Sequence, residues 1–356
     1  MKAGHRVTVL TTSRHDAVEK EEKNGFTIRF LTPSTPMKLS KSWFKESLSV
    51  VRELHAEAPI DVIHSNEFAA KGIIRWARKN AIPMAVVCHG SLRTELLSFL
   101  SAADMRPRYW HWLLLTPMHL IRRCILWEIP MRKASRSIIL VSPTLKRDFS
   151  AYSKGKVRVI ENGITLPDPP KRRASSDKLR LLCTGRADKQ KGFQTAIRAV
   201  SKMEDVPLHL DIVGTGPYFE DLKAISTHLN VDDRVTFHGR VEDDELSRIY
   251  SSADVYLIPT TRYEGLPLAL LEAMSHGIPT ISSDIGGNSD VITHGSDGLF
   301  IKPGDLSELI EAIHRLESDP VERHAISEAA RATAERRFDK HRMISETLEV
   351  LESIAG

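Results

Sequence analysis

The sequence predicts an α/β protein of two doubly wound, Rossmann-like domains, each built on a parallel sheet. The chain has 356 residues, which suits two domains of about 150 residues better than one. Short apolar segments rich in β-branched residues alternate with longer segments of helical periodicity, as in parallel sheets with helical crossovers. Residues 164–178 contain three prolines and no apolar periodicity, so we expect the linker between the domains there.

The expected strands are short apolar runs that a sheet covered on both faces would bury. In the first half they are residues 7–11, 27–31, 61–64, 84–88 and 137–141. In the second half they are residues 179–183, 208–213, 235–238, 255–259, 280–283 and 298–301. Residues 42–56 and the tail after residue 303 have the periodicity of helices.

Composition excludes several classes of protein. Hydrophobic residues make up 41% and charged residues 27%, which argues against disorder, and a net charge of +4 gives no reason to expect nucleic acid as a partner. Cys88, Cys124 and Cys183 form no Cys-x-x-Cys pair, so we expect a reducing, cytoplasmic compartment and no metal site. The start of the chain lacks the apolar run of a signal peptide. The most apolar stretch, residues 109–127, is too short and too charged to span a bilayer.

Two loops that follow expected strands have features of anion sites. Residues 184–193 carry Arg186 and Lys191 just before a helix, where free amides and the helix dipole favour a diphosphate. A solvated basic loop is the alternative. Residues 213–217 (VGTGP) carry Gly214 and Gly216, which allow a ligand close to the backbone, although an ordinary turn explains them as well.

The segment 260–274 carries the most information. It leaves an expected strand, passes Gly265, and enters a helix for which Pro267 suits the first position. Glu264 in the loop and Glu272 in the helix can line one pocket, where carboxylates accept hydrogen bonds from sugar and ribose hydroxyls. Two glutamates eight residues apart on a solvated helix face are the alternative.

Two features of the first domain are weaker. His89, with Gly90, follows an expected strand at the edge where ligands bind in doubly wound sheets, although a lone histidine is more often structural. The sequence Glu161-Asn162-Gly163 predicts only a turn before the linker.

The ordered motifs GRADKQKG, VGTGP, FHGRV and YEGLPLALLEAMSHGIPTISSDIGG resemble those of the retaining glycosyltransferases of family 4. The resemblance covers nearly the whole chain from Gly4 and is densest in the second half. It implies the GT-B fold, in which two Rossmann-like domains face each other across a cleft. It also implies sugar transfer from a nucleotide-diphosphate donor with retention at the anomeric carbon, and neither a metal nor another cofactor.

The resemblance assigns roles to individual residues. Arg186 and Lys191 match the phosphate-binding pair, Glu272 the ribose ligand, and Glu264 the ligand of the donor sugar. His89 would approach the transferred sugar, so His89 and Glu264 are the expected catalytic residues. The expected donor-binding residues are Arg186, Lys191, Gly214, Gly239, Arg240, Val241, Gly265, Leu266, Pro267 and Glu272. The expected domains are residues 1–165 and 166–335, with residues 336–356 returning to the first domain as a helix.

The start of the chain departs from the family pattern. Its first residues match the end of the first helix and the second strand, so we expect the usual first strand and its glycine-rich loop to be missing. A wrong start site, a truncated natural chain and a re-paired sheet are the possible explanations. Residues 7–11 and 61–64 would flank the absent strand. They would then pair directly, expose their facing edges, or be covered by another chain.

Residues 92–133 combine aromatic and basic residues that suit a membrane surface, which predicts peripheral docking near a saccharide or lipid-linked acceptor. The expected apolar stripe consists of Trp110, Leu113, Leu114, Ile121 and Cys124. A long helix packed on the first sheet is the alternative. The competing functions are a non-catalytic sugar-nucleotide binder and a nucleotide-sugar epimerase. A dinucleotide oxidoreductase is disfavoured because no Gly-x-Gly-x-x-Gly follows an early strand.

Overall fold

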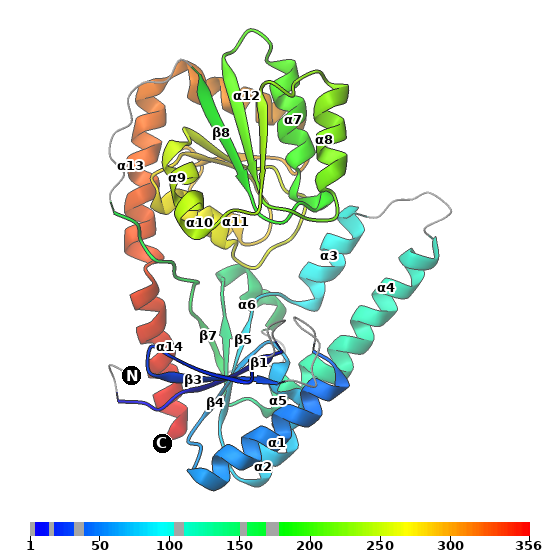
Figure 1. Ribbon diagram of the computed structural model, residues 1–356, viewed down its shortest axis with the longest axis vertical. Helices are drawn as coiled ribbons and strands as arrows, with labels where there is room; N and C mark the ends of the chain where they lie inside the picture. Colours follow the sequence, from blue (N-terminus) through cyan, green and yellow to red (C-terminus); the bar gives the residue numbers. More distant parts are fainter. Residues whose placement is uncertain (1–3, 14–17, 32–38, 103–109, 150–154, 169–177) are drawn as a thin grey trace.

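The computed structural model describes residues 4–13, 18–31, 39–102, 110–149, 155–168 and 178–356, with the side chains of residues 102 and 110–114 outside the description. Two α/β domains lie one above the other, and two consecutive C-terminal helices run along both (Figure 1). The predicted fold class is therefore confirmed: two Rossmann-like domains with parallel sheets.

The second domain is built on a six-stranded parallel sheet of order β10-β9-β8-β11-β12-β13. Its strands are β8 (Leu179–Thr184), β9 (Leu208–Val213), β10 (Val235–Gly239), β11 (Val255–Ile258), β12 (Thr280–Ser283) and β13 (Leu299–Ile301). All six were predicted. The strand order reverses between β8 and β11, and the loops at such a switch point form the usual ligand crevice of a doubly wound sheet.

The helices of the second domain cover both faces of its sheet. They are α7 (Phe193–Lys202), α8 (Phe219–His228), α9 (Asp243–Ser252), α10 (Leu268–Ser275), α11 (Asn288–Val291), α12 (Leu306–Ser318) and α13 (Pro320–Arg337). One hydrophobic cluster, with Leu181, Ile197 and Leu210 at its centre, belongs to this domain alone. The domain therefore has a core of its own.

The first domain contains a four-stranded parallel sheet of order β4-β5-β6-β7. Its strands are β4 (Ile63–Asn66), β5 (Met84–Cys88), β6 (Ser137–Leu140) and β7 (Val157–Val159). The helices are α1 (Lys41–Glu57), α2 (Ile74–Lys79), α3 (Leu92–Ala102), α4 (Trp110–Arg123), α5 (Ile129–Ala134) and α6 (Pro143–Phe149), with a 3₁₀ turn η1 (Ala69–Ile73) and a π-helical turn η3 (Cys124–Glu128). The predicted helix over residues 42–56 is confirmed as α1, whose N-cap Ser40 accepts a hydrogen bond from the amide of Trp43.

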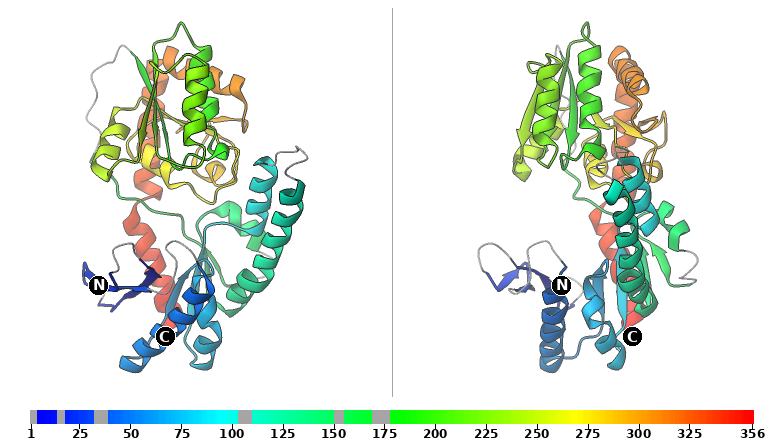
Figure 2. Two further views of the ribbon diagram at one scale, coloured as in Figure 1. Left: turned by 45° about the vertical axis from the view of Figure 1, so that its right-hand side comes forward. Right: turned by 90° about the vertical axis from the view of Figure 1, so that its right-hand side faces the viewer.

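The first strands of the chain form a separate sheet of order β1-β3-β2. It consists of β1 (Thr8–Thr12), β2 (Lys20–Lys23) and β3 (Phe26–Leu31), with β1 parallel to β3 and β2 antiparallel to it. Within the described residues β1 pairs only with β3 and β4 only with β5, so the two strands expected to flank a gap do not pair with each other. Figure 2 shows the two sheets standing apart.

One expectation about this small sheet was wrong: β1 is not buried on both faces, since Val9 is 38% exposed, and Val7, just before the strand, is 42% exposed. Strand β2 was missed, because its sequence is entirely charged. It forms a hairpin with β3, which was predicted. Asn24 and Gly25 connect its strands with φ values of +50° and +78°, as in a two-residue type I′ turn.

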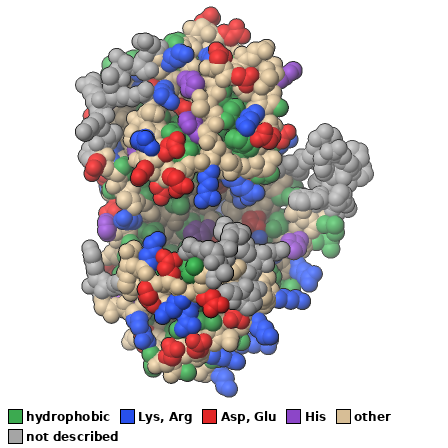
Figure 3. All heavy atoms as spheres, in the orientation of Figure 1, with side chains coloured by type: hydrophobic (Ala, Val, Ile, Leu, Met, Phe, Trp, Pro, Cys, Tyr) green, Lys and Arg blue, Asp and Glu red, His purple; other side chains and the backbone are tan. Residues whose placement is uncertain are grey.

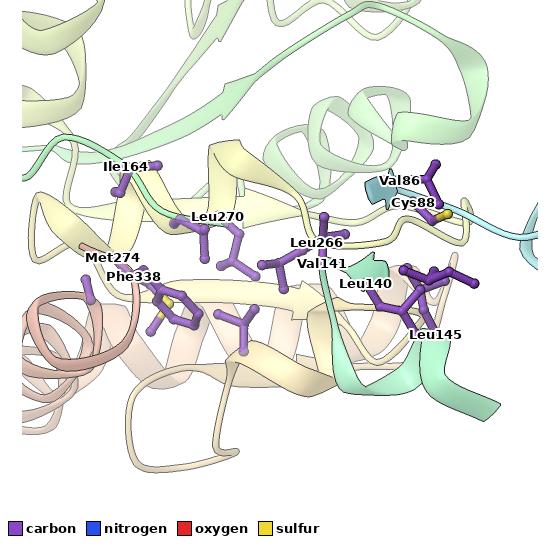
Figure 4. Close-up of a cluster of buried hydrophobic side chains, with 14 of the residues drawn as sticks. Val86, Cys88, Leu140, Val141, Leu145, Ile164, Leu266, Leu270, Met274 and Phe338 are labelled. Carbon is purple, nitrogen blue, oxygen red and sulfur yellow. The ribbon is translucent and has the colours of Figure 1, made fainter. Parts of the chain in front are cut away.

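The domains are joined by an apolar cluster that contains residues of both (Figure 4). Val141 of the first domain lies beside Leu266 of the second, and Phe338 extends the cluster between α13 and α14 (Lys340–Ala355). Helix α14 follows α13 and runs along the first domain, where Glu352 accepts a hydrogen bond from His5 at 2.9 Å. The two domains consequently share packing as well as a linker.

Candidate active site

The surface is hollowed between the two domains, and Lys and Arg side chains lie on the rim formed by the second domain (Figure 3). The loop after β8 contributes to this rim. Its 3₁₀ turn, η4 (Lys189–Lys191), ends at Gly192, and α7 begins at Phe193. Gly192 has φ +76°, and a Cβ there would lie 1.9 Å from the Pro259 carbonyl oxygen, so only glycine fits.

Of the two predicted phosphate ligands, only Lys191 meets another predicted residue. Its Nζ lies 2.6 Å from Oε1 of Glu264, and the two side chains are 22% and 18% exposed. Arg186 has a side chain that is 68% exposed, and its Nε lies 3.4 Å from Asp188. Lys191 is thus paired with another predicted site residue, whereas the Arg186 side chain is largely exposed and pairs with Asp188.

The glycines after β9 and β10 connect neighbouring loops. The Gly214 amide donates a hydrogen bond to the Gly239 carbonyl at 2.7 Å. A Cβ on Gly214, at φ +125°, would lie 1.9 Å from the Gly185 carbonyl oxygen. The close approach that requires glycine here is therefore made by the neighbouring loop. Arg240 is exposed at the same edge, and Val241 is partly buried against the interdomain cluster.

The loop before α10 touches the first domain directly. A Cβ on Gly265 would lie 1.9 Å from the carbonyl oxygen of His89, so the loop and the end of β5 meet backbone to backbone. The Gly287 amide supports the loop from behind by donating to the Glu264 carbonyl at 2.8 Å. Leu266 is buried, so only its backbone can face a ligand. Pro267 is the N-cap of α10 and not its first helical residue, so the helix begins one residue later than predicted, at Leu268.

Glu272 is positioned by a chain of hydroxyl groups. Tyr250 Oη donates to its Oε2 at 3.0 Å, and Thr184 Oγ1 lies 2.8 Å from Tyr250 Oη and 2.7 Å from Tyr256 Oη. One consistent direction lets Tyr256 donate to Thr184, Thr184 to Tyr250, and Tyr250 to the carboxylate. Burial raises the pKa of Glu272, and the Tyr250 hydrogen bond opposes that rise. Its second oxygen remains available to a ligand.

His89 directly follows β5 and is exposed. Desolvation by the surrounding walls lowers the pKa of His89, which favours the neutral imidazole at neutral pH. Its amide donates to Oε1 of Glu67 at 2.7 Å. Glu67 itself has φ +50° and a pKa raised to about 7, chiefly by burial, which outweighs the His89 hydrogen bond.

Sequence reasoning missed several residues that shape this site. Asn162, interpreted only as part of a turn, donates from Nδ2 to the Leu266 carbonyl at 3.2 Å and so links the domains. Glu67 directly follows β4, and its place after a strand was the one signal for it. Nothing in the sequence pattern singled out Tyr250. Within the described residues, no three His, Cys, Asp or Glu side chains are grouped to hold a metal ion.

Together these elements can bind a phosphorylated sugar compound. Lys191, the exposed Arg186 and the first amides of α7 and α10 supply positive charge, because the first amides of a helix have no intrahelical partner. Glu264 and Glu272 supply acceptors for hydroxyl groups. His89 lies in the other domain, with its backbone carbonyl against Gly265.

Two facing Rossmann-like domains with a cleft between them make the GT-B fold. Residues 1–166 match the family model described as Glycosyltransferase Family 4, and residues 167–333 match the model described as Glycosyl transferases group 1. The chain therefore belongs to this glycosyltransferase family.

Curated relatives agree with this classification. The sulfoquinovosyl transferase SQD2 of Arabidopsis thaliana is 26% identical over 352 residues, which cover 94% of this chain and 64% of that protein. The lipopolysaccharide core biosynthesis glycosyltransferase LpsD of Rhizobium meliloti is 34% identical over 223 residues, which cover 61% of this chain and 64% of that protein. The chain thus spans less than two thirds of the length of either relative.

Solved structures share the fold. Sucrose-phosphate synthase from Thermosynechococcus elongatus superposes with a TM-score of 0.82 at 20% identity, over 99% of this chain and 90% of that one. Anabaena HepE in complex with UDP and glucose superposes with a TM-score of 0.72 at 20% identity, over 87% of this chain and 82% of that one.

Proposed function

We propose that this protein transfers a sugar from a nucleotide-diphosphate sugar to a saccharide or lipid-linked acceptor with retention of anomeric configuration. The observation that carries this proposal is the Lys191–Glu264 pair, 2.6 Å apart, which joins the turn before α7 to the loop before α10. The loop before α10 meets the backbone of His89 in the opposite domain through Gly265. A cation, a hydroxyl acceptor and a histidine would then lie around one part of the cleft. The names of LpsD and SQD2 and the ligands of HepE support a nucleotide-sugar donor and a role in envelope or polysaccharide biosynthesis.

The chemistry follows from the charge that develops on the leaving group. The bond between the anomeric carbon and the β-phosphate oxygen breaks, and the acceptor oxygen bonds to the same face of that carbon. The acceptor's proton passes to the departing phosphate oxygen. Lys191, Arg186 and the amides near Gly265 would stabilise the diphosphate as its negative charge grows, which lowers the barrier. Glu272 would hold the ribose and Glu264 the sugar hydroxyls, and the loop at Gly239, Arg240 and Val241 would face the base.

We propose that these side chains and amides replace a metal ion and that the reaction takes place in the cytoplasm. Cys88, Cys124 and Cys183 are buried and unpaired, which suits a reducing compartment. Turnover should then persist in the presence of a chelator. Loss of turnover that a divalent metal restores would contradict the metal-independent proposal.

The decisive experiment is a mutant cycle on the central pair, with binding of the best nucleoside diphosphate measured by calorimetry. Lys191→Ala should weaken binding by about 1.5–3 kcal/mol, because it removes a charge-assisted contact and leaves Glu264 facing the phosphates. Lys191→Ala combined with Glu264→Gln should recover part of that loss. Lys189→Ala, in the same turn, serves as the control. Unchanged affinity in Lys191→Ala would contradict the phosphate assignment.

A non-catalytic sugar-nucleotide binder is the second candidate, favoured by the strand pairing of the first domain: within the described residues, β1 has only β3 and β4 only β5 as a neighbouring strand. Both candidates bind the donor, but only the enzyme cleaves it. A donor-hydrolysis and transfer assay separates them: donor binding without cleavage or transfer, over a panel of acceptors, would favour the binder. Analysis of the sugar product also excludes or reveals epimerisation.

A further inference from the structure

The helical segment α4–η3 has an apolar face that no other part of the described chain covers. Eleven large hydrophobic side chains of the described residues are exposed, and five of them lie on this segment. They are Leu115 (60%), Met118 (65%), Ile121 (45%), Ile125 (56%) and Leu126 (48%), here called the α4 face. Leu115, Met118, Ile121 and Ile125 are spaced by three or four residues, which places them on one side of the helix, and Leu126 follows directly. Such clustering marks an interaction surface rather than scattered exposure.

The opposite side of this segment already has its packing partners. Cys124 is buried, and Trp127 packs against Phe44 and Phe68 with ring centroids 5.6 and 5.1 Å apart. Arg123 forms an ion pair with Glu95 of α3. The predicted stripe that included Ile121 and Cys124 is therefore wrong for these two residues, because Ile121 is exposed and Cys124 is buried. Trp110, Leu113 and Leu114 lie outside the described side chains.

The surroundings of the α4 face are basic. Exposed cations on α2, α4 and α5 are Arg75, Arg78, Lys79, Arg122 and Lys133, and no ion pair of theirs is found within the described part of the chain. Helix α2 packs against α5, so these side chains belong to one region. In the described parts of α2, α4, η3 and α5 the one acidic residue is Glu128, which is buried beside Arg132 at 2.9 Å.

We propose that the α4 face docks on an anionic phospholipid bilayer. An apolar stripe flanked by unpaired cations is the chemistry that lies in a lipid interface, with the apolar side chains among the acyl chains and the cations at the phosphates. A second copy of this chain fits less well, because pairing two α4 faces would bring their cations together. Within the described residues no helix has the length and apolar character to cross a bilayer, so this contact lies on the surface.

Helix α3 connects the α4 face to the donor loops, so docking on a bilayer can serve the proposed reaction. Helix α3 packs against α4 and also holds the donor loops: Ser98 Oγ accepts from the Tyr263 amide at 2.9 Å, and Ser101 Oγ donates to the Thr261 carbonyl at 2.9 Å. In Figures 1 and 2 the α3–α4 pair stands beside the cleft. A docked α4 would bring the bilayer beside the donor loops, where a lipid-linked acceptor can enter. This last step rests on the proposed function, whereas docking itself does not.

The test is co-sedimentation of the full chain with vesicles of phosphatidylcholine, alone or mixed with phosphatidylglycerol. We expect binding to the mixed vesicles that weakens as salt is added. Met118→Glu combined with Ile125→Glu should lower the partition coefficient about tenfold or more. Val321→Glu changes an apolar side chain that is 81% exposed on α13, so this control should bind like the parent.

Binding of nucleoside diphosphate, measured on the same variants, separates the two proposals. Unchanged nucleotide affinity with lost vesicle binding supports docking and shows that the variant is folded. The docking proposal is wrong if the parent protein does not bind anionic vesicles. It is also wrong if the double variant binds them as well as the parent does. If the parent protein self-associates and the double variant does not, the α4 face binds a second copy of this chain. The docking proposal is then wrong as well.

Discussion

The carboxylates of Glu264 and Glu67 lie on opposite domains of the cleft and have different neighbours. Glu264 has a lysine at 2.6 Å, so its negative charge is compensated. Glu67 is half-buried near the carboxylates of Glu128 and Glu95, and its pKa rises to about 7. Its place directly after a strand was the one sequence signal for it. Its environment could not be predicted from the sequence, because it depends on residues that are far away along the chain. The Glu264 motif was predictable because its strand, glycine and helix are contiguous.

The raised pKa of Glu67 makes folding pH-dependent. In the unfolded chain this carboxyl titrates near 4.5, so between pH 4.5 and 7 the folded state binds more protons. Its stabilising effect is complete below pH 4.5 and is lost as pH rises through 7, by about 3 kcal/mol. Glu67→Gln should remove this slope from the free energy of unfolding, measured with denaturant at several pH values. The exposed Glu57→Gln should keep it. A slope that persists in Glu67→Gln would contradict the assignment.

The hydroxyl chain behind Glu272 predicts different effects for two similar substitutions. Tyr250→Phe removes the donor to the carboxylate and should weaken nucleoside diphosphate binding about fivefold, which corresponds to about 1 kcal/mol. Tyr256→Phe removes a hydroxyl further along the chain and should leave binding unchanged, with a similar loss of stability. Calorimetric titration of both variants is the measurement. Equal affinities in the two variants would show that Tyr250 does not position Glu272.

At the scale of secondary-structure elements, the more buried strands were easier to predict from the sequence. The six strands of the second sheet are short, and five of them have buried residues at both ends. Strand β2 (KEEK) carries no such signal, so only the Asn24-Gly25 turn could have revealed its hairpin. The separation of β1 from β4 was foreseen as one of three outcomes, since the strand expected between them is absent from the described sheets. Sequence periodicity alone does not decide among those outcomes.

The strand order predicts uneven protection from hydrogen exchange. Among the described strands β1 has β3 as its one neighbour, and it exposes Val9, whereas β5 lies between β4 and β6 and is almost wholly buried. Amides of β1 should therefore exchange much faster than those of β5, because exchange follows local opening. Mass spectrometry of labelled peptic fragments measures both, with β9 as an interior control. If the amides of β1 and β5 exchange equally slowly in a monomer, the edge of β1 that faces away from β3 is covered in solution.

At the scale of the molecule, the interdomain contact goes beyond the linker. The apolar cluster of Figure 4 includes Val141, Leu266 and Phe338, and hydrogen bonds at its margin join Thr144 to Asp290 at 2.8 and 2.9 Å. Arg337 donates to Glu161 at 2.6 Å across the same junction. An interface with an apolar centre and a polar margin couples the two folding units energetically. Each of these residues could be recognised as apolar from the sequence. Their packing against residues of the other domain could not be predicted, because it depends on how the two domains are placed relative to each other.

This coupling predicts that the two domains unfold together. Leu266→Ala should destabilise the whole chain by about 2–5 kcal/mol, because it opens a cavity between the domains. Leu210→Ala lies in the core of the second domain alone, yet it should shift the same single transition. Differential scanning calorimetry, with circular dichroism as a second probe, follows both variants. If there are two separate transitions and Leu210→Ala shifts only one of them, the domains unfold independently. The apolar cluster would then bring the domains into contact without making their unfolding cooperative.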